Sequence, residues 1–401
     1  MLIIQKFGGT SVATPALIQK CAAHAQKEIL KGNKVVVVVS AMAGVTDQLD
    51  AYVREISLAP SMREYDVVVS SGEQVTCGLM AIALRAMGLP AVSNLGWQVP
   101  VRTCATFGHS RIEGVDPAGL EDALSQGLIP VVAGFQGVTA DNELTTFGRG
   151  GSDITAVALA VALKADRCDL YKDVPGILTA DPRLVPQARL IPVMTGQEML
   201  ELASLGAKVL QPRAVEMALN LGARLRILST FEPGQGTLID LQEKTMEKAH
   251  VRALVCQKSQ AHVSLSHGGR VSDFLKSLER AHIPTDMISF VKDDLVLSLP
   301  QDKSAQAVSL LGQITNASIA LTGGLAKVSL VGNGLRAHPE ILRTVFDILD
   351  ERKIAVHASC VSETRMSLLI DEVYAELVLR LLHTAFDLDK EDPHAPHLQS
   401  A

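Results

Sequence analysis

Two glycine-rich turns carry the residues best suited to chemistry in this chain of 401 residues. The first, KFGGTS at residues 6–11, follows the apolar run LII, and the second, TTFGRGGSD at residues 145–153, precedes a helix-forming run. A glycine-rich turn between a strand and a helix exposes backbone N–H groups that favour phosphate and other anions. Lys6 adds a point charge, and Arg149 adds a planar fork that matches a carboxylate. The two turns together predict a site for two anions, a nucleotide phosphate chain and a carboxylate. Neither turn matches the dinucleotide or Walker patterns.

Acidic residues lie beside these turns. Asp153 could cap the following helix or hold a cation such as Lys6. The stretch SSGEQVT at residues 70–76 is interpreted as a third turn at a strand end, where Glu73 could contact an ammonium group or simply complement a helix dipole.

A fourth segment, YKDVPGILTADPRLVP at residues 171–186, is too long for a simple turn. Long ordered loops at strand ends of an α/β sheet are where ligands bind. Asp173, Asp181 and Arg183 could therefore meet a nucleotide or its Mg²⁺, with surface capping as the alternative.

The elements that must position these turns are expected to be strands and helices that alternate along the chain. Continuous valines without alternation indicate strands that are covered on both faces, as in a parallel sheet between helix layers. Between the strands lie helical patterns such as TAVALAVALKA at residues 155–165, so the first part is expected to be an α/β/α sandwich that closes near residues 233–239. Strands are expected at residues 34–41, 65–71, 128–135 and 167–174.

After a polar stretch at residues 241–250, the order of the expected strands and helices changes. The apolar runs of this second part predict a β-α-β-β-α-β unit, and the pattern then restarts without its last strand. The unclaimed strand at residues 251–256 could complete that second unit. The expected division is a catalytic part, a linker, two ferredoxin-like units and a flexible tail, at residues 1–240, 241–250, 251–324, 325–390 and 391–401.

Composition narrows the classes of partner. The formal net charge is −6 and aromatic residues make up 3%, which argue against nucleic acid and anionic membranes. No apolar run approaches the ~20 residues of a membrane span, and the N-terminus lacks the features of a signal peptide. The scattered cysteines form no C-x-x-C pair, so free thiols in a reducing cytoplasm are expected rather than disulfides or zinc. The histidines of the terminal HAPH are interpreted as part of a frayed end.

An ordered set of motifs resembles the aspartate kinases of the amino acid kinase superfamily, which carry C-terminal tandem ACT domains. The motifs are KFGGTS, VVVSAMAGVTD, SSGEQ, GFQG followed by TTFGRGGSD, DVPGILTADPRLVP and MLELASLGAKVLQPRAVE, and the resemblance extends from Met1 to about residue 388. It implies that ATP, with Mg²⁺, phosphorylates the side-chain carboxylate of L-aspartate to give 4-phospho-L-aspartate. This reaction is the first step toward lysine, diaminopimelate, threonine and methionine.

The chemistry of such a reaction is consistent with the residues. The nucleophile is a carboxylate with a reference pKa of about 3.9, so it is already ionised at neutral pH and needs no general base. Catalysis then rests on positioning and on neutralising charge at the transferring phosphoryl group.

The resemblance implies roles residue by residue. Lys6, Gly8 and Gly9 match residues against the transferring phosphate, Ser40 matches a serine near it, and Asp153 matches the aspartate that organises the active-site lysine. The residues that match contacts to aspartate, or that frame them, are Thr46, Glu73, Arg149, Gly150, Gly151 and Ser152. Those that match the nucleotide lining are Lys6, Phe7, Gly8, Gly9, Lys172, Asp173, Leu178, Arg183, Lys208 and Val209. No metal ligand from the protein is implied, because Mg²⁺ enters with ATP.

Two positions depart from the family pattern. Lys172 stands where Thr or Ser is commoner, and Leu178 stands where Tyr is commoner. These departures bear on the adenosine contacts rather than on the phosphoryl transfer.

The resemblance of the second part to tandem ACT domains implies an amino-acid effector, namely lysine, threonine or diaminopimelate. Asp286 is a candidate contact for this effector. The resemblance also implies a homodimer or larger homo-oligomer through the ACT domains. The first repeat reads SHGGRVSDF where many relatives carry an Asp-x-Pro-Gly turn. The alternative is that the repeat only dimerises the protein.

Two other functions compete. One is another amino acid kinase, acting on glutamate, acetylglutamate or carbamate. The other is an effector-binding sensor with an inactive kinase domain, which would predict the loss of Lys6, Arg149 or Asp153, and all three are present.

Overall fold

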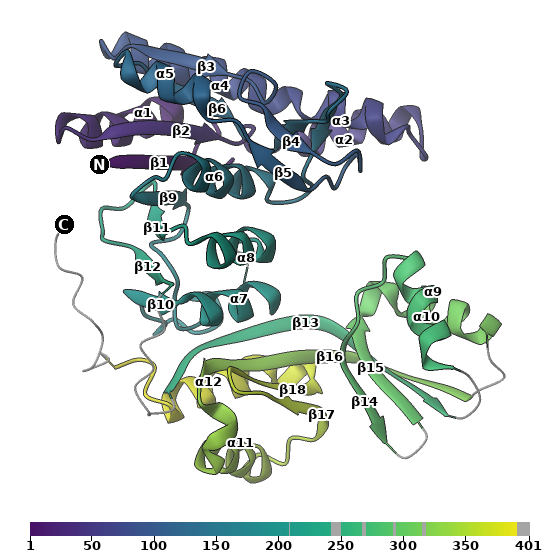
Figure 1. The fold of residues 1–401 in the computed structure, drawn as a ribbon. Coiled ribbons are helices and arrows are strands. Elements are labelled where there is room, and N and C mark those ends of the chain that lie inside the picture. Colours follow the sequence, from purple (N-terminus) through teal and green to yellow (C-terminus); the bar gives the residue numbers. More distant parts are fainter. Residues whose placement is uncertain (208, 242–249, 267–269, 292–293, 315–317, 391–401) are drawn as a thin grey trace.

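The computed structural model describes residues 1–207, 209–241, 250–266, 270–291, 294–314 and 318–390. Lys208, most of the expected linker and the expected tail at residues 391–401 lie outside the described residues. The described chain forms two parts, an N-terminal one built on a mainly parallel sheet and a C-terminal one built on an antiparallel sheet (Figure 1).

An eight-stranded sheet forms the centre of the N-terminal part. All of its neighbouring pairs are parallel except β11 with β12. The order across the sheet is β10 (Val193–Thr195), β12 (Thr237–Asp240), β11 (Leu225–Ser229), β9 (Arg167–Lys172), β1 (Leu2–Phe7), β2 (Lys34–Val39), β6 (Ile129–Ala133) and β3 (Ala91–Asn94).

Helices cover both faces of this sheet, which confirms the expected α/β/α sandwich. In β2, the side chains of Val35, Val37 and Val39 pack on α1 (Pro15–Leu30) and α4 (Ser71–Ala86). Val36 and Val38 face the opposite core, which includes α5 (Ala118–Ser125), α6 (Gly151–Ala162), α7 (Gly196–Ser204) and α8 (Pro212–Leu221). The unbroken valine run is therefore explained by burial on both sides.

The strand expected at residues 65–71 is wrong, because the structure places these residues in a helix. They lie in α3 (Met62–Val69), which follows α2 (Val45–Ile56) and leads through Ser70 into α4. Asp66 and Val69 face inward at helical spacing, while Val67 is exposed. The packing of one helix face has overridden the β propensity of three consecutive valines. SSGEQVT is therefore a helix junction and not a strand-end turn.

The helical stretch Met62–Ala86 is long and apolar enough to cross a membrane by length and composition alone. More than half of its most apolar window is buried inside the protein, at 56%, so this is weak evidence for a span. The expectation that no apolar run approaches the length of a membrane span is therefore corrected for the stretch Met62–Ala86, by length and composition only.

A small four-stranded sheet lies beside the main one, in the order β5 (Ile112–Val115), β4 (Val101–Thr103), β7 (Gln136–Val138) and β8 (Leu144–Thr146). Strand β8 leads directly into the turn that carries Arg149 and then into α6. The small sheet therefore supports the second glycine-rich turn.

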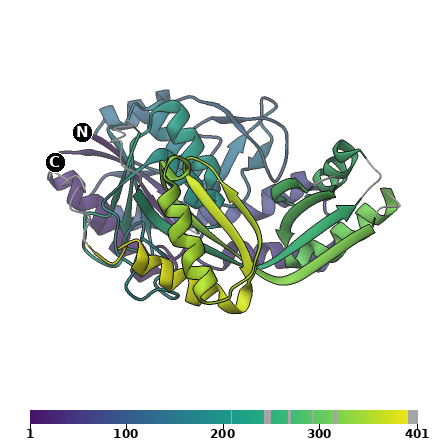
Figure 2. The same cartoon turned by 90° about the horizontal axis from the view of Figure 1, so that it is seen from below.

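The C-terminal part is a single antiparallel sheet of six strands. Its order is β14 (Asp286–Val291), β15 (Asp294–Pro300), β13 (His250–Ser266), β16 (Ser318–Asn333), β18 (Arg365–Asp371) and β17 (Val356–Val361). The helices of this part are α9 (Val271–Arg280), α10 (Gln301–Ile314), α11 (Pro339–Glu351) and α12 (Ala375–Ala385). The half with α9 and α10 extends away from the N-terminal part (Figure 2).

Two long strands run through both halves of that sheet, where separate short strands were expected. The stretch Val251–Cys256 forms the first half of β13 and pairs with Val328–Gly332 of β16. The expected boundary at residues 324 and 325 falls inside β16, at Gly324, whose φ is 70°. The two expected units therefore share continuous strands.

Candidate active site

The carboxyl ends of four parallel strands bring the expected phosphate residues together. Phe7 of β1 pairs with Val39 of β2 and with Tyr171 of β9, and Val39 pairs with Ala133 of β6. The residues that follow, at positions 8, 40, 172 and 134, therefore meet at one edge of the sheet. Open α/β sheets bind ligands at this edge. The ring of Phe7 is buried and stacks on Tyr171 with centroids 4.7 Å apart, so at the edge Phe7 offers its backbone.

A buried carboxylate joins two lysines at this edge. The Lys6 ammonium lies 2.5 Å from Oδ1 of Asp153 and the Lys172 ammonium lies 2.7 Å from Oδ2. Lys6 and Asp153 are only 4% and 2% exposed. The pairing of Asp153 with Lys6 that the sequence suggested is therefore present, and Lys172 is a second partner. The three groups carry one net positive charge, which favours an anionic ligand.

Burial and charge act in opposite directions on these groups. Desolvation lowers the pKa of Lys6 to about 8, against the attraction of Asp153. Desolvation alone would raise the pKa of Asp153, but the two ammonium groups outweigh it and hold the pKa at about 2. The carboxylate thus stays ionised while Lys6 is poised near the edge of its protonated range.

Glu73 lies in the first turn of α4 and faces the same edge. Its Oε1 accepts a hydrogen bond from the backbone N–H of Ala41 (2.9 Å), just beyond Ser40 at the end of β2. Its Oε2 is buried and has no hydrogen-bond partner among the described residues. Desolvation raises the pKa of Glu73 to about 7. A buried carboxylate oxygen without a donor is suited to receive an ammonium group.

The first glycine turn is tightly packed at Gly9, where a Cβ would lie 3.0 Å from the carbonyl oxygen of Ala41. A Cβ at Gly8 would make only ordinary contacts, 3.6 Å from the carbonyl oxygen of Tyr171 and 3.7 Å from the Lys6 ammonium. Ser40 donates its backbone N–H to the carbonyl of Phe7 (3.1 Å) and is half-buried. The backbone of the first turn is therefore packed against the end of β2.

The second turn ends at the N-terminus of α6. Gly150 has a φ of 74°, and a Cβ there would lie 1.8 Å from Cγ of Gln211. Gly151 and Ser152 begin the helix and are buried, whereas Arg149 is exposed and pairs with no carboxylate among the described residues. Thr46 lies in the first turn of α2 and is half-buried. The exposed guanidinium of Arg149 is thus accessible to a ligand.

The expected nucleotide residues divide into two groups. Asp173 is exposed and directly follows Lys172, so it belongs to the edge described above. Leu178 forms an isolated bridge with Leu190, and Arg183 is 83% exposed and paired with Asp181 (2.6 Å). Within the described residues no hydrogen bond or ion pair joins these two to the Lys6 cluster. Val209 is half-buried, and Lys208 lies outside the described residues.

The loop that carries Leu178 and Arg183 contacts the C-terminal part. Thr179 Oγ1 and His383 Nε2 of α12 share a hydrogen bond (2.9 Å), and Arg380 donates to the carbonyl of Leu184 (2.7 Å). Ala180 and Val185 are buried in the core of the C-terminal part. The expected nucleotide loop is therefore packed against the expected regulatory half.

Asp286, the expected effector contact, lies at the start of β14. It forms an ion pair with the buried Lys327 and lies 4.0 Å from Arg365, whose other nitrogen is 3.9 Å from Glu201 of α7. The charge of Lys327 lowers the pKa of Asp286 against the effect of burial. Any cationic group that binds Asp286 would share it with Lys327.

Three polar residues that the sequence did not single out help to build the site: Asp66, Gln211 and Arg213. Asp66 was hidden in the stretch interpreted as a strand. Gln211 and Arg213 belong to the motif MLELASLGAKVLQPRAVE, and Arg213 donates to the carbonyls of Phe147 (2.9 Å) and Ser110 (3.0 Å). For Arg213, the only signal in the sequence was that a basic residue stands at the start of a predicted helix.

Comparison with known proteins defines the class. Residues 1–229 match the amino acid kinase family and residues 328–386 match an ACT domain. The chain is 42% identical to aspartokinase 2 of Bacillus subtilis over 401 residues, covering 97% of this chain and 98% of that protein. It is also 42% identical to an aspartokinase of Pseudomonas aeruginosa over 404 residues, with the same shares covered.

Solved structures agree with the sequence relatives. Aspartokinase III of Escherichia coli in complex with aspartate and ADP, an R-state structure, superposes with a TM-score of 0.79 at 28% identity, covering 96% of this chain and 99% of that one. The same enzyme in complex with lysine and aspartate, a T-state structure, gives a TM-score of 0.77 at 27% identity, covering the same shares. The chain belongs to the aspartokinases of the amino acid kinase family. It is an aspartate kinase, a phosphotransferase.

Proposed function

We propose that the edge formed by β1, β2 and β9 holds the phosphates of ATP, while the turn at residues 148–152 and Glu73 hold L-aspartate. The observation that carries the proposal is the buried cluster in which Asp153 joins Lys6 and Lys172. Its excess positive charge in a low-dielectric setting suits the charge that develops during phosphoryl transfer.

In this proposal Lys6 lies against the transferring phosphoryl group, and the N–H groups of Gly8 and Gly9 and the hydroxyl of Ser40 complete the cradle. Asp153 orients Lys6 and keeps it protonated. Two fixed cations also screen the approach of one anion, the aspartate carboxylate, to another. The substrate carboxylate needs no base, because it is ionised at neutral pH.

In this proposal, aspartate recognition uses opposite charges for a carboxylate and for the ammonium group. Arg149 would grip a carboxylate bidentately, supported by the backbone of Gly150, Gly151 and Ser152. Oε2 of Glu73 would accept the ammonium group, and Thr46 would contact the substrate from α2. An ammonium partner would relieve the desolvation that raises the pKa of Glu73.

We propose that ATP is the nucleotide, consistent with the ADP bound in the related E. coli structure. Lys172, Asp173, Leu178, Arg183, Lys208 and Val209 are the proposed lining, together with Phe7 through its backbone. Mg²⁺ would enter bound to the phosphate oxygens, as this ion prefers few protein ligands and keeps several waters. Among the described residues there is no group of three or more His, Cys, Asp and Glu side chains suited to a metal.

We further propose that an amino acid regulates the enzyme through the C-terminal part, as the lysine complex of E. coli aspartokinase III suggests. Lysine, threonine and diaminopimelate are the candidate effectors, and Asp286 is the candidate contact. Inhibition by these amino acids and methionine, alone and in pairs, identifies the effector. The replacement Asp286→Asn should then weaken inhibition without changing uninhibited turnover.

The remaining proposals concern organisation. We infer a homodimer or larger homo-oligomer through the C-terminal part and a cytoplasmic location, which the reduced cysteines support. We propose a catalytic domain at residues 1–240, a linker at 241–250, ACT domains at 251–324 and 325–390 with residues 251–256 completing the second, and a tail at 391–401. Sedimentation at several protein concentrations tests the oligomer.

Hydroxamate formation from ATP, L-aspartate and hydroxylamine tests the proposed site. The wild type should form the product, and the replacements Lys6→Met and Arg149→Ala should lower kcat and raise the KM for aspartate, respectively. A coupled ADP-release assay with glutamate, acetylglutamate and carbamate tests the substrate. Equal turnover on any of these would contradict the assignment of aspartate.

A further inference from the structure

Lys172 is the member of the charged cluster that a ligand can reach most directly. Its ammonium donates to Oδ2 of Asp153 (2.7 Å), and no other side chain among the described residues pairs with it. An ammonium group has three N–H donors, so two of them remain available to a ligand. The Lys172 side chain is 15% exposed and the Lys6 side chain 5%, so Lys172 reaches the surface of the sheet edge from a buried anchor.

The backbone of Lys172 is fixed by the strands on both sides. Lys172 ends β9, where it pairs with Ser229 of β11, and its carbonyl accepts the N–H of Thr230 (2.9 Å). The carbonyl of the preceding residue, Tyr171, accepts the N–H of Gly8 (3.3 Å). The ammonium therefore extends from a rigid strand end. A charge held in this way stabilises a transition state without a cost of reorganisation.

The order of the strands separates Lys172 from two of the proposed aspartate contacts. Strand β1, which carries Lys6, lies between β9 and β2. Thr46 lies in α2, which follows β2, and Glu73 is bonded to Ala41, just beyond the end of β2. Neighbouring strands lie about 4.8 Å apart, so the ends of β9 and β2 are roughly 10 Å apart, on opposite sides of β1. Lys172 thus extends from the side of Lys6 away from these contacts.

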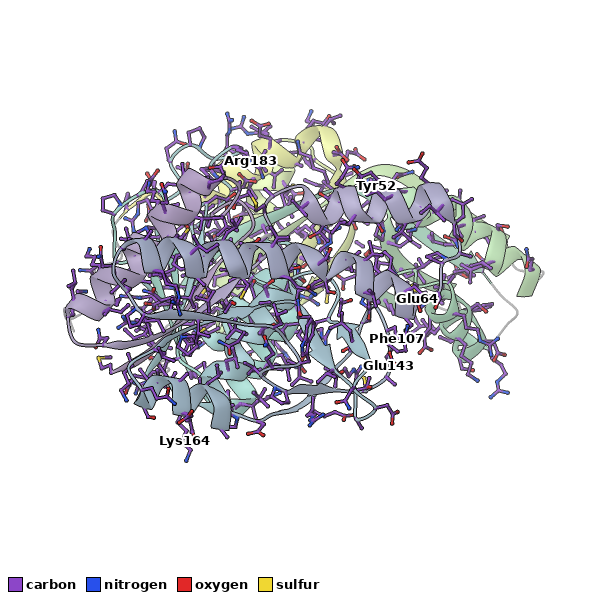
Figure 3. The ribbon with its side chains drawn as sticks, turned by 90° about the horizontal axis from the view of Figure 1, so that it is seen from above. Tyr52, Glu64, Phe107, Glu143, Lys164 and Arg183 are labelled. Carbon is purple, nitrogen blue, oxygen red and sulfur yellow. The ribbon has the colours of Figure 1, made fainter. Side chains whose placement is uncertain are left out.

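The other cation that the structure describes in the expected nucleotide lining, Arg183, lies elsewhere. Its guanidinium is 83% exposed and paired with Asp181 (2.6 Å). The next residue, Leu184, packs against the core of the C-terminal part, and Figure 3 shows Arg183 beside that part, drawn in pale yellow. Of these two cations, Lys172 is therefore the one next to Lys6.

We propose that the Lys172 ammonium binds the β-phosphate of the nucleotide and stabilises the leaving group of the phosphoryl transfer. The inference rests on the proposed function, in which Lys6 lies against the transferring phosphoryl group. As an oxygen of the aspartate side-chain carboxylate bonds to the γ-phosphorus, the bond from that phosphorus to the bridging oxygen breaks. The electron pair of the broken bond stays on the β-phosphate of ADP.

The reaction gives such a cation a specific task. The transition state of phosphoryl transfer is loose in most analyses, so the departing oxygen gains negative charge before the new bond is complete. A fixed ammonium on the leaving side stabilises that charge, while Lys6 acts on the transferring group. In this proposal, the departure from the family pattern at Lys172 bears on the phosphoryl transfer, where adenosine contacts were expected.

A series of nucleotides tests which group Lys172 binds. Calorimetry with Mg²⁺ measures the Kd of AMP, ADP and the β,γ-methylene analogue of ATP for the full-length enzyme and for Lys172→Met. The AMP Kd should change less than about twofold. The ADP Kd should rise about 10- to 100-fold, as expected for one hydrogen bond to a charged group, and the analogue should weaken by the same factor. Turnover in hydroxamate formation should fall by on the order of 10- to 100-fold, less than for Lys6, because Lys172 is partly exposed.

Two variants serve as controls for charge. Lys172→Arg keeps the positive charge and should retain most of the ADP affinity. Lys34→Met removes the same charge from an exposed lysine at the opposite edge of the sheet, where β2 begins, and should change none of the three Kd values.

A pH profile tests the contact with the cluster independently. Burial is the largest cause that lowers the pKa of Lys6, and the nearby charge of Lys172 lowers it further. In Lys172→Met, the decline of kcat/KM for ATP at alkaline pH should therefore move to higher pH. An unshifted decline would overturn the inference, because Lys172 would then not act beside Lys6.

The binding results distinguish the inference from its alternatives and from the function beneath it. Equal weakening of AMP and ADP would overturn it in favour of an adenosine contact, and weakening of the ATP analogue alone would overturn it in favour of the γ-phosphate. Unchanged ADP affinity would leave Lys172 with a structural role. If Lys172→Met does not fold, Lys172→Thr provides the same series. If Lys6→Met leaves kcat unchanged, the proposed phosphate site itself is wrong.

Discussion

Replacing Lys6 by methionine removes one positive charge from the buried cluster and keeps most of the side-chain volume. Lys6 and Lys172 share Asp153 in the wild type, with one net positive charge over the three groups. Without Lys6, Lys172 and Asp153 neutralise each other and no excess charge remains to meet the phosphoryl group. We expect kcat to fall strongly while the protein still folds.

The magnitude follows from the electrostatics. Two unit charges about 4 Å apart interact by about 4 kcal/mol at an effective dielectric constant near 20. Removing one preorganised contact of this kind typically costs about 10²–10³ in kcat. Breaking a buried ion pair costs about 3–5 kcal/mol of stability when the partner is left alone. Asp153 keeps Lys172 at 2.7 Å, so the loss of stability should be smaller.

Hydroxamate formation at saturating ATP and aspartate measures kcat, and thermal unfolding measures stability. A kcat within about threefold of the wild type would refute the assignment of Lys6 to the phosphate, because the expected loss is far larger. A loss of turnover that merely follows unfolding would refute it equally. Lys6→Arg serves as the control that keeps the charge and changes the geometry.

Three further predictions concern charge and backbone. With a pKa of about 8 for Lys6, kcat/KM for ATP should fall as pH rises through 8 in the wild type, and Lys6→Arg should remove this decline, because its guanidinium stays protonated; pH–rate profiles measure both. The pKa of Glu73 is raised from 4.5 to about 7, so the stability that its proton contributes is present below pH 4.5 and lost by pH 7. Glu73→Gln should therefore stabilise the ligand-free enzyme at pH 8 by on the order of 3 kcal/mol in denaturant unfolding, while raising the KM for aspartate. Gly150→Ala should lower the free energy of unfolding by about 1–3 kcal/mol, because residue 150 has a φ of 74° and a Cβ there clashes with Gln211. Adding Gln211→Ala to this variant should restore only the part of the lost stability that is due to the clash.

Much of the proposed phosphate-binding edge of the sheet was predictable as structure from the sequence, because its signals are local. A lysine and two glycines directly after an apolar run, and a Gly-Arg-Gly-Gly turn before a helix, specify strand ends and helix starts by their own conformational needs. The valine run of β2 likewise indicated burial on both faces. Parallel pairing then brings such turns to one edge, so proximity followed from topology.

What the sequence did not indicate depends on tertiary contacts. Residues 65–71 resemble a strand because of their valines, yet the fold uses one helical face of them and buries Asp66. Lys172 could not be placed against Asp153 without knowing that β9 lies beside β1. The long strands β13 and β16 were also divided at polar or glycine positions, because a local irregularity in a strand resembles a turn.

Lys6 and Glu73 of the proposed site are both buried, and burial disfavours the charged form of each until the proposed ligand supplies an opposite charge. Burial lowers the pKa of Lys6 and raises the pKa of Glu73, so the charged forms of both are penalised by the fold itself. A phosphate would stabilise the Lys6 ammonium, and the aspartate ammonium would stabilise the Glu73 carboxylate, so each shift would reverse on binding. Part of the binding free energy would thus come from relief of desolvation that folding has already imposed. The same reasoning explains why Asp153, which has both lysines as partners, needs no ligand to remain charged.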